Sequence, residues 1–99
     1  MILTEEQAMA EPGAIRLDFN DGFIIVQIID DALHILLIVW SRCRLHFGAM
    51  LHVLTGAALA WGCRTIEGVG RVGWRRKLLP LGFEERADGT IFKELYHGR

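Results

Sequence analysis

The sequence predicts an α/β (α+β) domain: one mixed, mostly antiparallel sheet of about six strands, with helices on both faces. Apolar runs bounded by Asn-Asp-Gly and Asp-Gly turn signals indicate strands in the first and last thirds of the chain. A stretch with apolar residues at helical spacing lies between them. The length of 99 residues suits one core rather than two. We therefore expect a single domain over 1–99, with a helix or arm at 1–13 and a tail at 96–99.

The composition limits the classes of partner. The net charge is −1, from 11 basic and 12 acidic residues, so no global attraction to nucleic acid or to an anionic membrane is expected. The hydrophobic fraction of 52% is slightly high, which leaves apolar surface for a partner or for a homo-oligomer. The acidic N-terminus does not resemble a signal peptide, and polar residues interrupt the apolar region 23–40, so we expect neither secretion nor a transmembrane segment. Cys43 and Cys63 lack zinc-site spacing, and we predict no metal site.

The chain begins with signals for a short helix and a half-buried strand. Thr4-Glu-Glu-Gln7 fits a capping box for a helix from about Glu5 to Ala10. Ile15, Leu17 and Phe19 then alternate with polar residues, which is typical of a strand with one buried face.

Two more apolar strands should complete an antiparallel meander. Asn20-Asp21-Gly22 predicts a hairpin, since glycine tolerates the positive φ that such turns demand. Phe23–Ile29 is apolar on both sides except at Gln27, and Leu33–Trp40 is almost wholly apolar, a pattern typical of central strands covered on both faces.

A long helix follows, and a parallel strand after it. One helical face carries six apolar residues: Phe47, Met50, Leu51, Leu54, Ala58 and Trp61. Gly62 is a plausible C-cap, and Arg64–Val69 reads as the next strand. The strand–helix–strand unit should be a right-handed parallel crossover.

The last third reads as a short helix and a hairpin. Trp74, Leu78 and Leu81 give a short amphipathic helix, which Pro80 should fray or end because proline lacks a backbone donor. Strands at 83–86 and 90–96 are joined across Ala87-Asp88-Gly89, another hairpin signal.

This order of elements resembles the GNAT (N-acetyltransferase) superfamily over roughly Ala14 to Leu95. Its most specific part is Gly73-Trp-Arg-Arg-Lys-Leu-Leu-Pro-Leu-Gly-Phe83, which is similar to the short helix and Leu-Gly-Phe corner common in that superfamily. The chain looks most like small GNAT-like proteins of tailed phages, some of them associated with head assembly or with the virion interior.

The phage resemblance implies a binding or virion-assembly module without standard acetyltransferase catalysis. Trp74, Arg75, Arg76 and Lys77 would then dock onto a phage virion or host protein. The expected location is the cytoplasm of a bacterial host, or the phage particle itself. Such a module needs no cofactor.

The alternative that the resemblance implies is a minimal acetyl-CoA-dependent N-acetyltransferase. Arg42, Arg44, Gly48 and Ala49 would hold the cofactor pyrophosphate at a helix N-terminus. Glu67 would accept the proton of the amine. The position at which many GNAT enzymes carry an acid tyrosine is Leu78, which cannot transfer a proton.

Simpler interpretations stay open for most of these residues. A small nucleic-acid-binding module could use Arg71 to Lys77, although aromatic residues for base stacking are lacking. Glu67 could be an outward strand residue paired with Arg64 or Arg71. The tryptophans at 40, 61 and 74 are most simply core residues, and His34 reads as a core or interface histidine.

Overall fold

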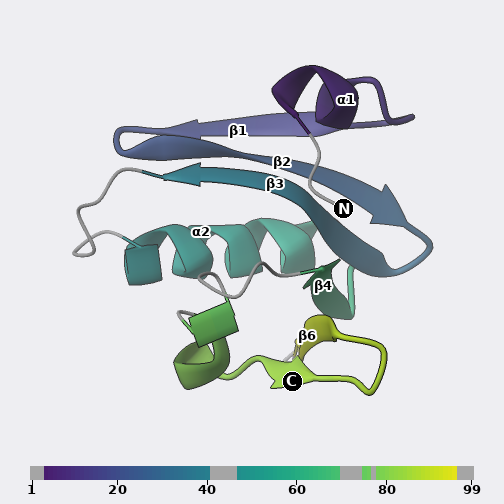
Figure 1. The fold of residues 1–99 in the computed structure, drawn as a ribbon, viewed down its shortest axis with the longest axis vertical. Helices are drawn as coiled ribbons and strands as arrows, with labels where there is room; N and C mark the ends of the chain where they lie inside the picture. The colour runs from purple at the N-terminus through teal and green to yellow at the C-terminus, as the bar shows by residue number, and fades with distance from the viewer. Residues whose placement is uncertain (1–3, 41–46, 70–74, 77, 96–99) are drawn as a thin grey trace.

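A twisted six-stranded sheet runs through the molecule in the order β1-β2-β3-β4-β6-β5 (Figure 1). The computed structural model describes residues 4–40, 47–69, 75–76 and 78–95. The elements in chain order are α1 (Glu5–Met9), β1 (Ile15–Phe19), β2 (Gly22–Ile29), β3 (Ala32–Trp40), α2 (Phe47–Ala60), β4 (Thr65–Val69), the 3-10 turn η1 (Leu79–Leu81), β5 (Glu84–Glu85) and β6 (Thr90–Glu94). Strands β3 and β4 pair in parallel and all other pairs are antiparallel. The predicted fold class is confirmed.

The β1–β2 hairpin forms at the predicted turn, but its glycine serves another purpose. Gly22 is not among the glycines with positive φ. A Cβ atom at Gly22 would instead overlap the carbonyl oxygen of Val39 on β3 and crowd Trp40. The expectation of a positive φ was therefore wrong, and close approach of two backbones requires the glycine.

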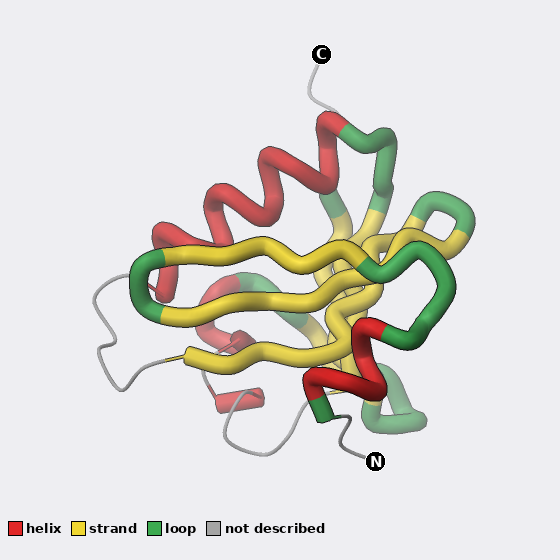
Figure 2. The backbone as a smooth tube through the Cα atoms, turned by 90° about the horizontal axis from the view of Figure 1, so that it is seen from above, coloured by secondary structure: helices red, strands yellow, loops and turns green. Residues whose placement is uncertain are grey.

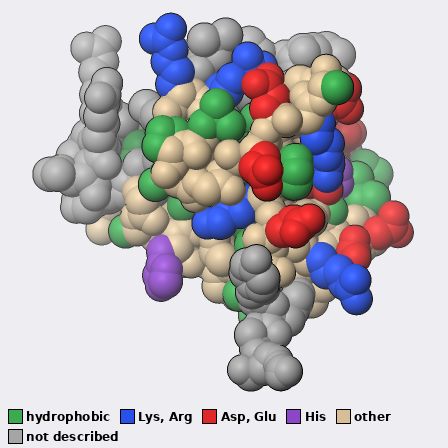
Figure 3. All heavy atoms as spheres, turned by 90° about the horizontal axis from the view of Figure 1, so that it is seen from below, with side chains coloured by type: hydrophobic (Ala, Val, Ile, Leu, Met, Phe, Trp, Pro, Cys, Tyr) green, Lys and Arg blue, Asp and Glu red, His purple; other side chains and the backbone are tan. Residues whose placement is uncertain are grey.

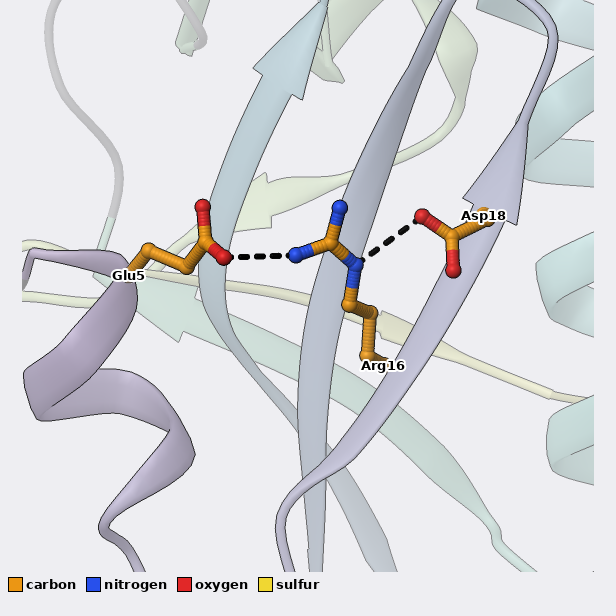
Figure 4. Close-up of polar contacts among 3 residues, drawn as sticks. All are labelled: Glu5, Arg16 and Asp18. Atoms are coloured by element: carbon orange, nitrogen blue, oxygen red, sulfur yellow. Dashed lines mark hydrogen bonds and ion pairs between the residues drawn. The ribbon is translucent and has the colours of Figure 1, made fainter.

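Helix α1 is fixed by its cap and by one arginine. The predicted capping box is present: Gln7 N donates to Thr4 Oγ1 at 3.1 Å and Thr4 N donates to Gln7 Oε1 at 2.9 Å. Arg16 on β1 then bridges the helix and its own strand (Figure 4), with Nη1 2.6 Å from Glu5 Oε2 and Nε 2.9 Å from Asp18 Oδ1. Local sequence signals thus place α1 over the sheet.

The main core lies between α2 and one face of the sheet. Buried side chains from β2, β3, β4, β6, α2 and the η1 region form it: Ile24, Val26, Leu33, Met50, Leu51, Leu54, Ala58, Cys63, Ile66, Leu78, Phe83 and Ile91. Trp40 packs against this core as expected. Trp61 does not, because α2 ends at Ala60 and Gly62 turns the chain with φ 80°, which leaves Trp61 42% exposed.

The opposite face of the sheet is thinly covered. Helix α1 packs on β2 and β3 through the buried Ala8, but it lies over one end of the meander (Figures 1 and 2). Toward the other end Val39 is 44% exposed. The expectation that β2 and β3 are fully covered on both faces therefore holds for the α2 face alone.

The segment after β4 has the predicted Leu-Gly-Phe corner. Helical residues at 75–76 and 78 tighten into η1 where Pro80 occurs, because proline removes the donor that an α-helix needs. Gly82 ends the turn with φ 96°. Lys93 on β6 fixes the corner by donating from Nζ to Leu81 O at 3.2 Å.

Candidate functional site

The pairing between the parallel strands β3 and β4 stops halfway along β3. Among the described residues, strand β4 pairs with β3 from Ala32↔Thr65 to Ile35↔Gly68, whereas β3 continues to Trp40. On its other edge β3 pairs with β2 all the way to Trp40. Leu36 is an extra residue on β3, since Ile25 pairs with Leu37 and Val26 with Ile35. This bulge bends the strand at the point where the opening begins.

The N-terminus of α2 follows the carboxyl end of β3. This 14-residue helix has no acidic residue in its first turn, so no carboxylate there competes with an anion for the positive end of the helix dipole. Gly48 and Ala49 lie there and are exposed, and no described atom outside the helix's own backbone lies within 4 Å of the Cβ position of Gly48. Arg42 and Arg44, the other predicted pyrophosphate contacts, lie outside the described residues.

Glu67 lies on the face opposite α2, one residue before the opening. Its neighbour Ile66 points into the core with α2, and alternation along β4 sends Glu67 to the other side. Arg86 Nη1 donates to Glu67 Oε1 at 2.9 Å, and Thr65 Oγ1 donates to Glu67 Oε2 at 3.0 Å. The hydrogen bond from Arg86, followed by that from Thr65, lowers the pKa of Glu67 despite its partial burial.

Arg86, the partner of Glu67, is a residue that sequence reasoning missed. Its guanidinium also lies over the Phe92 ring, 4.2 Å from the centroid, which orders the arginine on this face. The sequence pointed instead to Arg64 or Arg71. Arg64 ion-pairs with Asp31 at 3.7 Å. No sequence signal identifies Arg86, because the pairing depends on the β4–β6 register and on a bend after β5.

An open hollow adjoins Glu67 at the amino end of β4. It has a volume of about 750 Å³ and is lined by Asp31, Gly62, Arg64, Thr65, Glu67, Glu94 and Leu95. Three carboxylates face one arginine in this lining, so the hollow favours a cation. It lies beside the predicted base rather than beside the α2 N-terminus.

Leu78 cannot act as the acid that many GNAT enzymes carry at this place. Its side chain is 1% exposed and belongs to the main core. Burial gives leucine at this position a packing role, which accounts for its identity without any catalytic requirement.

The basic cluster after β4 is only partly described. Trp74 and Lys77 lie outside the described residues, whereas Arg76 is exposed and Arg75 ion-pairs with Glu85 at 3.0 Å. Seen from the β5–β6 side, acidic and basic side chains are interspersed (Figure 3). Among its described side chains, this face therefore has no purely basic patch that would bind the phosphate backbone of a nucleic acid.

Two further kinds of site are absent from the described residues. In residues 4–40, 47–69, 75–76 and 78–95, no three metal-binding side chains of the His, Cys, Asp or Glu type lie together. Within the same ranges, no helix combines the length and apolar character needed to cross a bilayer.

The chain is similar in sequence to part of one curated protein. It is 30% identical over 88 residues to carnosine synthase 1 of Mus musculus, and that stretch covers 89% of this chain. The chain spans about 9% of the length of that relative, so the likeness does not transfer the activity of the whole protein. No protein-family model matches the chain.

Several solved structures share the arrangement of strands and helices. The ribosomal-protein-S18-alanine N-acetyltransferase from Escherichia coli superposes with a TM-score of 0.70 at 17% identity, over 98% of this chain and 80% of that one. N-acetylglutamate synthase from Neisseria gonorrhoeae, in complex with coenzyme A and N-acetyl-glutamate, superposes with a TM-score of 0.70 at 11% identity. The superposition covers 96% of this chain and 28% of that chain.

A third neighbour is closer to this chain in size. The anti-CRISPR protein AcrVA5 gives a TM-score of 0.68 at 15% identity, over 81% of this chain and 97% of that chain. Identities this low bear on fold alone. The order of strands and the N-acetyltransferases among the structural neighbours show that this chain has the GNAT fold.

Proposed function

We propose that this chain binds an acyl-CoA thioester in the opening between β3 and β4 and transfers the acyl group to an amine. The observation that carries the proposal is the early end of the β3–β4 pairing, at Ile35↔Gly68, while β3 runs on to Trp40. Among the described residues, β4 offers no partner to the backbone of Leu36–Val39 on this side, and such groups are available to a ligand because backbone amides and carbonyls seek partners.

The donor set fits such a ligand. Backbone groups along Leu36–Val39 match an amide-rich arm, and the first turn of α2 offers amides to a pyrophosphate without a competing carboxylate. The open space over Gly48 lets a phosphate come close to the backbone. A bound acyl thioester would supply an activated acyl group.

The comparisons favour this enzymatic alternative over the assembly role. Structural neighbours are mostly named as acetyltransferases, and two of them are complexes with coenzyme A. Nothing in the comparisons supports an origin in tailed phages or a place in a virion. Docking through the basic cluster is also less attractive once Arg75 is ion-paired to Glu85.

Isothermal titration calorimetry with acetyl-CoA tests the proposal. We expect saturable binding in the micromolar range that free coenzyme A competes away. Charge reversal at Arg44 should abolish the heat, because it would place a carboxylate beside the phosphates. Arg76→Glu, a reversal at an exposed arginine outside the proposed donor set, is the matched control and should bind normally. Absence of binding at millimolar acetyl-CoA would contradict the proposal.

A further inference from the structure

A row of side chains crosses the face of the sheet that carries α1, beside the opening. Strand register aligns Gln27 on β2, His34 on β3, Glu67 on β4 and Phe92 on β6. Gln27 Nε2 donates to Pro12 O at 2.8 Å, and Glu67 is bound by Arg86 and Thr65. Within the described part of the chain, the half-buried His34 makes no hydrogen bond or ion pair.

His34 is placed where the opening starts. Its two chain neighbours, Leu33 and Ile35, pack against the α2 core, so His34 points to the opposite face. The last β3–β4 pair, Ile35↔Gly68, is the next one along the strand. An amine bound at the opening on this face would lie beside the half-buried imidazole of His34, at the end of the sheet that α1 partly covers.

Glu67 is the neighbouring charge, and it is poorly suited to accept the proton itself. Two hydrogen bonds hold its carboxylate, and they lower its pKa. A carboxylate that holds its proton so weakly is a weak base at neutral pH. A fixed anion beside an imidazole instead stabilises the positive charge that the ring acquires on protonation.

We propose that His34 is the catalytic base and that Glu67, held by Arg86 and Thr65, is its positioning residue. The proposal rests on the acyltransferase function. The amine nitrogen forms a bond to the thioester carbonyl carbon, and the carbon–sulfur bond breaks. The sulfur leaves with the bonding electron pair as a thiolate. His34 takes the proton from the amine nitrogen and returns it through solvent to the thiolate, so that amine and thioester become amide and thiol.

Thiol release from acetyl-CoA in the presence of a short lysine-containing peptide tests this role. We expect His34→Asn to lower the rate at least about 100-fold, the size of a lost general base. The matched control is His52→Asn, at an exposed histidine on α2, which should keep the wild-type rate. Both variants should keep the wild-type melting temperature to within a few degrees and bind acetyl-CoA in calorimetry with unchanged affinity.

Chemical rescue separates the base from a structural histidine. Added imidazole should restore thiol release to His34→Ala and should not restore it to Glu67→Gln, which keeps its base but loses the neighbouring anion. If the wild type and His34→Asn release thiol at the same rate, the assignment of His34 is overturned. This holds also when both rates are at background. Failure of the acyltransferase function itself would show separately, as absence of acetyl-CoA binding to the wild-type protein.

Discussion

At the scale of single residues, Gly22 shows how one backbone contact determines an amino acid. The carbonyl oxygen of Val39 occupies the space that a Cβ atom would need. We expect Gly22→Ala to lower the free energy of unfolding by about 1–3 kcal/mol, as overpacking does. Gly56→Ala, in open space on α2, should raise it by up to about 1 kcal/mol because alanine favours helix. Urea denaturation measures the free energy of unfolding of both variants. Equal changes in the two variants would contradict the packing role of Gly22.

The Glu67 carboxylate predicts a dependence of stability on pH. Its pKa is lowered in the folded protein by Arg86 and Thr65. The folded state therefore binds this proton less tightly than the unfolded state, in which a glutamate has a pKa of about 4.3. The ion pair stabilises the fold fully above that pH, and the stabilisation disappears as the pH falls through the lowered pKa.

Glu67→Gln should remove this part of the acid dependence. We expect the melting temperature of the variant to fall less steeply than that of the wild type between about pH 5 and pH 3. Asp88, whose pKa is lowered chiefly by its hydrogen bonds to Thr90, contributes with the same sign in both proteins and cancels in the comparison. If the melting temperatures of the two proteins fall equally steeply across this pH range, the ion pair does not form.

At the scale of elements, α2 has two exposed glycines that separate binding from stability. No atom lies within 4 Å of the Cβ position of Gly48 or of Gly56, so a larger side chain fits at either place. Gly48→Leu should stabilise the helix and yet weaken acetyl-CoA binding at least about 10-fold, because the side chain covers the first-turn amides. Gly56→Leu should stabilise the helix alone. Calorimetry measures the affinity of each variant for acetyl-CoA. Equal affinities of Gly48→Leu and Gly56→Leu would exclude the α2 N-terminus as the phosphate site.

The elements that the sequence could predict are those with local signals. The capping box at Thr4, the hairpin at Asp88-Gly89 and the positive-φ Gly62 all follow from nearby residues, and the structure has each of them. The burial of Trp61 was predicted wrongly, because the apolar spacing of a helix does not show where the helix ends.

The candidate site was less predictable, because it depends on register. His34 and Glu67 are far apart in the chain and become neighbours only when β3 pairs with β4. Arg86 reaches Glu67 across a further strand pair. Periodicity assigns each residue to a face of its own strand, but it does not align one strand with another.

At the scale of the whole molecule, the sheet has one well-covered face and one open face. Helix α2 and the η1 segment cover the first, whereas α1 covers one end of the second (Figure 2). A thioester held on the α2 side and an amine arriving on the open side would meet at the opening between β3 and β4.

The location of the acyl-CoA site can be measured by an NMR titration of the isotope-labelled protein with acetyl-CoA. We expect amide shift changes to concentrate at Leu36–Trp40 and at the first turn of α2, including Gly48 and Ala49. The amides of β1 and of the β5–β6 hairpin should change little. Changes confined to that hairpin, or no change at saturating acetyl-CoA, would contradict the account.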